Sequence, residues 1–143
     1  MLFRSDCRHL PLPDNSVKSI MFDPPFLATK GPSLKSNKGN KIVNRFGAYS
    51  SEEELNLFYS DSLTEFYRVL RPDGILVFKC QDKVSNGIQR MTHIYICNEA
   101  EKVGFKILDL FVLLAKVRLT PEWQVKNQQH ARKYHSYFLV FQK

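Results

Sequence analysis

Apolar residues recur along this chain with two spacings, one typical of strands and one typical of helices. Short apolar runs at 17–22, 75–80, 105–117 and 134–142 predict strands. Between the first two runs, apolar residues repeat at helical spacing; they are Leu55, Phe58, Tyr59, Leu63, Phe66, Tyr67 and Leu70. Strands that alternate with helices predict an α/β fold with a mostly parallel sheet. The nearly continuous run at 75–80 is typical of a strand that is covered on both faces.

Local signals set the ends of two predicted helices. Ser51 precedes three glutamates, and the serine with Glu54 forms a capping-box signature. The first helix should end at the turn formed by residues 71–74, which contain proline and glycine. We expect a second helix from about residue 86 to residue 102, with Gly104 as the left-handed residue that follows it.

Length and composition are ordinary for one soluble globular domain spanning residues 1–143. Hydrophobic residues make up 43% and charged residues 24% of the chain. No apolar run reaches the ~18–20 residues that a membrane span requires, and no signal peptide is recognisable. The formal net charge of +7 fits a polyanionic partner such as nucleic acid.

Cysteine and histidine spacing favours neither disulfides nor a metal site. The three cysteines, Cys7, Cys80 and Cys97, are odd in number and widely separated. We expect them to be reduced, in a cytoplasmic protein. The four histidines lack partners at metal-binding spacing, so no metal is expected.

The first predicted strand ends in Asp23-Pro24-Pro25-Phe26, which offers an unusual set of groups. A carboxylate only accepts hydrogen bonds, and proline lacks an N–H, so this backbone presents mainly carbonyls. Asp23 and the Pro24 carbonyl could hold an amino group, with its flat ring against Phe26. The structural alternative is a strand followed by a Pro-Pro turn and a core phenylalanine.

The tetrapeptide resembles the catalytic D/N/S-P-P-Y/F/W motif of the amino-group methyltransferases that use S-adenosyl-L-methionine. Residues 6–17 are similar to the D-x-R-x-L-P-x-x-D-x-S segment of that family. Residues 71–79 resemble its L-R-P-G-G-x-L-x-x-K turn and fifth strand, and residues 134–141 its seventh strand. The resemblance runs over nearly the whole chain. It implies a Rossmann-like class I methyltransferase sheet, mostly parallel, with an antiparallel strand near the C-terminus.

This resemblance also implies roles for particular residues. Asp23, Pro24, Pro25 and Phe26 would be catalytic, with Asp23 also next to the S-adenosyl-L-methionine cofactor. Asp6 and Cys7 would contact the cofactor adenine, although Asp6 could equally be a turn residue. The implied reaction is methyl transfer to an exocyclic amine, and adenine N6 in DNA is the leading candidate for that amine. RNA amino groups are an alternative, because RNA enzymes share the motif.

Basic residues in two predicted loops could contact phosphates, or could simply be solvated. The candidate nucleic-acid contacts are Lys30, Lys35, Lys38, Lys41, Arg45, Arg132 and Lys133. A base inside a duplex cannot reach a catalytic pocket, so it must be flipped out or already single-stranded.

One part of the family pattern is missing. The family carries a glycine-rich cofactor loop after its first strand, but none of the six glycines here precedes Asp23 and no G-x-G occurs. We therefore expect an N-terminally truncated fold that lacks the first strands. An uncovered sheet edge would favour a homodimer or an N-terminal partner. The alternative function is a non-catalytic remnant, or one part of a split methyltransferase that binds nucleic acid.

Overall fold

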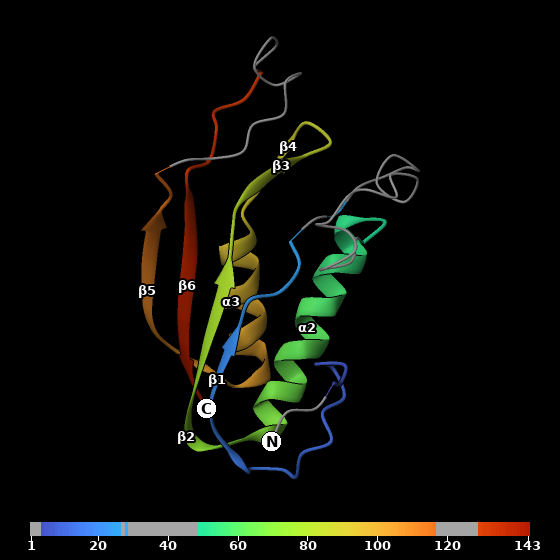
Figure 1. Ribbon diagram of the computed structural model, residues 1–143, viewed down its shortest axis with the longest axis vertical. Coiled ribbons are helices and arrows are strands. Elements are labelled where there is room, and N and C mark those ends of the chain that lie inside the picture. The colour runs from blue at the N-terminus through green and yellow to red at the C-terminus, as the bar shows by residue number, and fades with distance from the viewer. Residues whose placement is uncertain (1–3, 27, 29–48, 117–128) are drawn as a thin grey trace.

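The four apolar runs predicted as strands pair into a single sheet. In the computed structural model, which describes residues 4–26, 28, 49–116 and 129–143, the strand order is β1-β2-β6-β5 (Figure 1). The four strands are β1 (Val17–Phe22), β2 (Leu70–Cys80), β5 (Lys106–Leu114) and β6 (His135–Gln142). Two helices, α2 (Glu52–Val69) and α3 (Thr92–Val103), connect them, and β3 (Lys83–Ser85) and β4 (Ile88–Arg90) form a hairpin.

Three of the four sheet strands share one direction. β1 pairs parallel with β2, and β6 pairs antiparallel with both β2 and β5. The antiparallel strand expected near the C-terminus is therefore confirmed. Because this reversed strand lies between β2 and β5, only one of the three described pairings is parallel. The expectation of a mostly parallel sheet is therefore confirmed for strand direction, because three strands run the same way. It is wrong for strand pairing, because two of the three pairings in this sheet are antiparallel.

Helix α2 begins where its capping signal predicts, and it ends at Val69, shortly before residues 71–74, which were predicted as a turn and lie within β2. The Ser51 side chain accepts a hydrogen bond from the Glu54 backbone N–H at 3.1 Å. The Glu54 carboxylate accepts from the Ser50 N–H at 2.8 Å, one residue earlier than in a standard capping box. After the helix, Gly74 is required, because a Cβ there would lie 2.8 Å from the Arg71 carbonyl oxygen.

The prediction of a helix from residue 86 was wrong, since the structure places a hairpin there. Asn86 and Gly87 have φ values of 52° and 75°, which is the conformation of a two-residue type I′ turn. Strands β3 and β4 flank this turn, and α3 begins only at Thr92. The predicted end is confirmed, because Gly104 is left-handed with φ 116° and its N–H reaches the Ala100 carbonyl. Among the described residues, neither helix has the length and apolar composition needed to cross a membrane.

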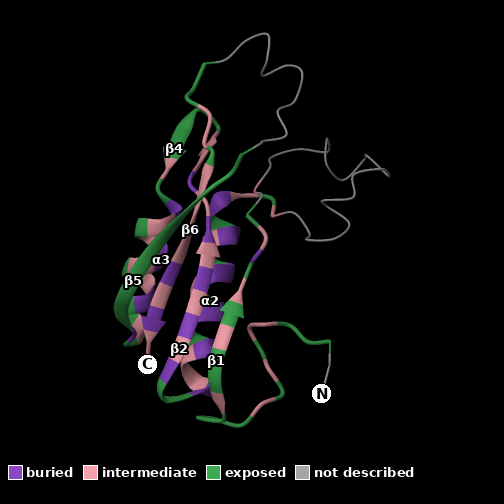
Figure 2. Ribbon diagram, turned by 60° about the vertical axis from the view of Figure 1, so that its left-hand side comes forward, coloured by how far each residue is buried: buried purple, intermediate pink, exposed green. Residues whose placement is uncertain are grey.

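Both helices pack on the same face of the sheet and form the core with it. Leu76 and Phe78 of β2 and Leu139 and Phe141 of β6 are fully buried in one cluster with side chains of α2 and α3. Figure 2 shows the buried positions alternating along these central strands. The Phe78 ring makes edge-to-face contacts with Phe22 and with Tyr59 of α2, at centroid distances of 5.1 and 5.6 Å.

The other face of the sheet is apolar and open within the described residues. Met21, Phe111 and Leu113 are 60%, 58% and 52% exposed, and Val77 is half-buried. Covering on both faces, which the apolar run of β2 predicted, is therefore seen on one face only. β1 is also an edge of the described sheet. These features are the physical basis for the expected homodimer or N-terminal partner, which stay predictions, as does the truncation.

Glu65 ties the N-terminal segment to α2. Its Oε1 atom accepts hydrogen bonds from the Leu10 backbone N–H and from Arg68, each at 2.7 Å. Hydrogen bonding from Arg68 lowers the pKa of Glu65 below its ordinary value of 4.5. The carboxylate thus stabilises the fold above pH 4.5, and this stabilisation is lost as the pH falls through the lowered folded-state pKa.

We expect Glu65→Gln to lower the free energy of unfolding by about 1–3 kcal/mol at pH 7, because charge-assisted hydrogen bonds are lost. The difference from the wild type should shrink at pH 3, because below pH 4.5 the unfolded state binds a proton that the folded-state carboxylate, with its lowered pKa, binds less readily. Urea unfolding at both pH values measures this, with Glu101→Gln at an exposed position of α3 as the control. An equal loss at both pH values would contradict the role assigned to the Glu65 charge.

Candidate active site

The carboxyl ends of β1 and β2 bring the candidate residues together. Phe22 and Phe78 are partners in the parallel ladder, so Asp23 leaves β1 beside the end of β2. Strand β6 begins at the same place, because Cys80 pairs with Tyr137. This convergence of strand ends is the position at which open α/β sheets bind ligands.

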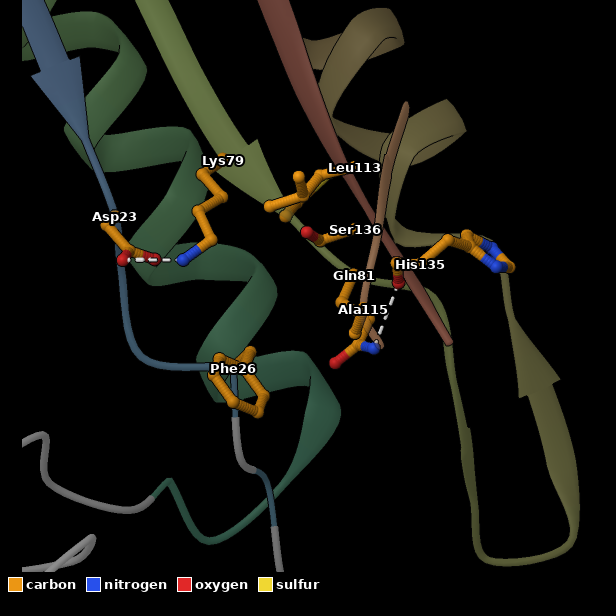
Figure 3. A pocket seen from close by; sticks show the side chains of 9 residues that line it. Asp23, Phe26, Lys79, Gln81, Leu113, Ala115, His135 and Ser136 are labelled. Atoms are coloured by element: carbon orange, nitrogen blue, oxygen red, sulfur yellow. Dashed lines mark hydrogen bonds and ion pairs between the residues drawn. The ribbon is translucent and has the colours of Figure 1, made fainter. Parts of the chain in front are cut away.

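A hollow of about 200 Å³ opens at these strand ends (Figure 3). Its lining residues are Asp23, Phe26, Lys79, Cys80, Gln81, Leu113, Ala115, His135 and Ser136. The hollow is smaller than the roughly 300–1,000 Å³ typical of drug-sized ligands, so it suits a fragment such as one flat ring.

Asp23 and Phe26 are both open to this hollow. The Asp23 side chain is 54% exposed and Phe26 is 43% exposed. Oδ2 of Asp23 accepts a hydrogen bond from Lys79 Nζ at 2.8 Å, and Figure 3 shows these two side chains facing each other. The Phe26 ring is therefore available for stacking and is not the core phenylalanine of the structural alternative.

Two side chains hold the backbone of the Asp23–Phe26 motif. The buried Tyr59 hydroxyl donates to the Pro25 carbonyl at 2.8 Å, and Lys83 Nζ donates to the Phe26 carbonyl at 2.6 Å. Burial raises the pKa of Tyr59, so this hydroxyl keeps its proton. Within the described residues, no donor reaches the Pro24 carbonyl. This carbonyl follows the Asp23 carboxylate in the chain, but Pro24 is buried and is not among the residues that line the hollow.

Lys83 is itself held in place by an ion pair. Its Nζ lies 3.0 Å from Oε1 of Glu52, and the two side chains are only 16% and 8% exposed. Burial lowers the pKa of Lys83, and the hydrogen bond with Glu52 opposes this shift. The pair joins the first turn of α2 to β3, and so holds in place the ammonium that donates to the Phe26 carbonyl.

Gln81 and Asp82, which directly follow β2 at the same sheet end, have different surroundings. Gln81 lines the hollow and donates to the His135 carbonyl at 3.0 Å. Asp82 is buried and accepts hydrogen bonds from the His93 backbone N–H and Tyr137 hydroxyl, while its Oδ1 lies 2.8 Å from His93 Nδ1. Asp82 thus organises the base of the hairpin and the start of α3, and of the two residues only Gln81 lines the hollow.

Asp6 and Cys7 lie along α2 and do not line the hollow. Arg8 donates to both oxygens of Asp6, at 3.1 and 2.7 Å, and these bonds lower the pKa of Asp6 to about 2. Cys7 Sγ lies 3.4 Å from the Ser62 hydroxyl of α2. The structure does not bring these two residues together with Asp23, and their assignment to a cofactor stays a prediction.

Two of the candidate nucleic-acid contacts lie in the described residues. Arg132 and Lys133 precede β6, at the end of the sheet where Asp23 is found. The remaining candidates, Lys30, Lys35, Lys38, Lys41 and Arg45, lie outside the described residues.

The other chemical groups of the described residues give no second centre. All three cysteines are free, and burial raises the pKa of Cys80, which disfavours a reactive thiolate. Among the residues that the structure describes, no three His, Cys, Asp or Glu side chains are grouped to hold a metal ion.

Sequence reasoning missed Lys79, Tyr59 and Lys83 as site residues. Lys79 could have been found, because the predicted strands 17–22 and 75–80 should end side by side if they pair in parallel. Nothing in the sequence marked Tyr59 as a site residue, because it occupies one of the regularly spaced apolar positions of a helix.

Comparison with known proteins shows the fold. No family model matches the sequence, and no characterised protein matches it at the sequence level. A Thermus thermophilus protein, provisionally named a DNA modification methylase and crystallised with S-adenosyl-L-methionine, matches with a TM-score of 0.64 and 21% identity. That match covers 96% of this chain and 53% of the other.

Two further structures share the fold. The cytosine-N4-specific PvuII DNA methyltransferase matches with a TM-score of 0.62 and 16% identity, over 93% of this chain and 44% of its own. A SAM-dependent methyltransferase from Methanosarcina mazei matches with a TM-score of 0.53 and 12% identity, over 97% and 65%. This chain therefore has the fold seen in these proteins. It spans about half the length of the Thermus and PvuII proteins.

Proposed function

We propose that this chain carries the target-base site of an S-adenosyl-L-methionine-dependent methyltransferase that modifies an exocyclic amino group of a nucleic-acid base, adenine N6 in DNA. One observation carries the proposal. The Asp23 carboxylate and an exposed Phe26 ring line one hollow at the sheet end of a fold shared with DNA methyltransferases, and the carbonyl of the buried Pro24 between them has no donor among the described residues.

These groups match the demands of methyl transfer to an aromatic amine. Such an amine is a poor nucleophile, because its lone pair is delocalised into the ring. Asp23 and the Pro24 carbonyl can each accept one N–H, which favours the tetrahedral nitrogen that attacks the methyl carbon. The nitrogen would become positive on accepting the methyl group, and the Asp23 carboxylate would stabilise that charge until the extra proton passes to water. Phe26 positions the ring by stacking.

S-adenosyl-L-methionine would supply the methyl group and leave as S-adenosylhomocysteine. The hollow has the size of one flat ring, so the described residues fit the target base and do not by themselves enclose the cofactor as well. Asp6 and Cys7 remain our proposal for contacts to the cofactor adenine, with Asp23 nearest the transferred methyl group.

The choice of base and polymer is the finer part of the proposal. Adenine N6 and cytosine N4 present similar amines, and the PvuII enzyme acts on cytosine N4. We place DNA before RNA because the similar structures include DNA methylases. Arg132, Lys133 and the basic residues between 30 and 45 would contact the phosphates, consistent with the net charge of +7.

Calorimetric titration with S-adenosylhomocysteine is the first test. One-site binding, followed by methyl transfer to DNA, would support the proposal. A folded chain that binds neither S-adenosylhomocysteine nor DNA would contradict it. Binding of DNA without S-adenosylhomocysteine would favour the alternative, a nucleic-acid-binding part of a split or inactive enzyme.

A further inference from the structure

Asp23 and Lys79 form a facing pair on the open side of the sheet. They directly follow Phe22 and Phe78, which are ladder partners and pack against the core, so both side chains emerge on the opposite face of the sheet. Nζ of Lys79 lies 2.8 Å from Oδ2 of Asp23, and the side chains are 32% and 54% exposed. Both line the hollow beside Phe26 (Figure 3).

Each member of this pair has hydrogen-bonding capacity left for a ligand. Within the described residues, Lys79 donates to Oδ2 of Asp23 and no donor reaches Oδ1. An ammonium carries three hydrogens, so Lys79 can donate further bonds while it stays on the carboxylate. A partly exposed ion pair contributes little to stability, so the fold alone is a weak reason for this arrangement.

A carboxylate beside an ammonium matches one particular chemical edge. It offers an acceptor next to a donor, which suits an N–H that lies next to a bare ring nitrogen. Adenine has this edge at N6 with N1 or N7, and cytosine has it at N4 with N3. The exposed Phe26 ring favours such a planar ligand.

We propose that Lys79 selects the target base by donating a hydrogen bond to the ring nitrogen that flanks the amine held by Asp23. This inference rests on the proposed function and adds the second contact that recognises the base. Lys79 is a specificity residue, because an ammonium does not help a nitrogen that is becoming positive. Removal of the Lys79 ammonium should therefore reduce discrimination between bases, whereas the ammonium is not expected to speed up the methyl-transfer step.

Base analogues that lack one ring nitrogen test the proposal directly. Protein-observed NMR titration would compare 2′-deoxyadenosine with its 1-deaza and 7-deaza analogues, and 2′-deoxycytidine with its 3-deaza analogue. For the preferred nucleoside, we expect loss of one ring nitrogen to weaken binding to the wild type by about 10- to 100-fold. Lys79→Met should bind parent and analogue equally. Lys102→Met, at an exposed lysine of α3, should keep the wild-type discrimination.

Two outcomes would overturn the inference. They are equal binding of parent and analogues by the wild type, and discrimination that survives in Lys79→Met, whether or not that variant binds S-adenosylhomocysteine more weakly. The wild-type comparison decides the question even if Lys79→Met fails to fold. A wild type that discriminates but transfers no methyl group to DNA or RNA supports the role of Lys79 and overturns the proposed reaction.

Discussion

Asp23→Ala should reduce methyl transfer by about 100-fold or more, the size of effect seen when one preorganised electrostatic contact to a transition state is removed. The carboxylate is proposed to accept an amine hydrogen and to stabilise the charge that develops on nitrogen. In the variant, the Pro24 carbonyl alone would hold the amine, and Lys79 would place an uncompensated positive charge beside it. Transfer of labelled methyl groups to DNA measures the loss.

The fold should survive this change. The Asp23 side chain is 54% exposed and its ion pair with Lys79 is partly exposed, so we expect at most about 1 kcal/mol of lost stability. Asp61→Ala, at an exposed position of α2, is the matched control and should keep full activity. An Asp23→Ala protein with wild-type transfer rates would show that the motif is a structural turn.

Phe78→Ala should lower the free energy of unfolding by about 3–5 kcal/mol, the usual cost of removing a fully buried phenylalanine. The side chain is 0% exposed and packs edge-to-face on Phe22 and Tyr59. A domain of this size is typically stable by only about 5–15 kcal/mol, so much of that stability would be lost. Guanidinium unfolding monitored by circular dichroism measures the change.

Val77→Ala is the control for this prediction. Val77 is the preceding residue of β2, but it is half-buried on the open face. Truncation there leaves no enclosed cavity among the described residues, so we expect a loss of about 1 kcal/mol or less. Similar losses for the two variants would mean that the open face is covered in solution as fully as the helical face.

Phe78 also connects the core to the site. It supports the ring of Tyr59, whose hydroxyl holds the Pro25 carbonyl at 2.8 Å. The Asp23–Phe26 motif is thus positioned through packing as well as through hydrogen bonds. A Phe78→Ala protein that still folds should therefore bind the target base more weakly than the wild type.

Local chemistry determined most of the secondary structure in advance. The spacing of apolar residues predicted the four sheet strands and α2, because burial of one face is visible in the sequence itself. The end of α3 was predictable from Gly104, because a left-handed residue after a helix favours glycine. The start of α3 was not recognised, although Asn86-Gly87 is a hairpin signal, because the apolar positions around it also fitted a helix.

The sequence by itself also determined the chemistry of the candidate motif, since an acid, two prolines and an aromatic residue leave only certain groups to bind a ligand. Only the tertiary structure decided which residues stand around it. Lys79, Leu113 and Ser136 reach the hollow through strand pairings between residues far apart in the chain. The order β1-β2-β6-β5 likewise depends on long-range pairing, so a reversed strand between β2 and β5 could not be read from local spacing. Local patterns record what each segment buries, whereas the neighbours of a side chain are fixed only when the whole sheet forms.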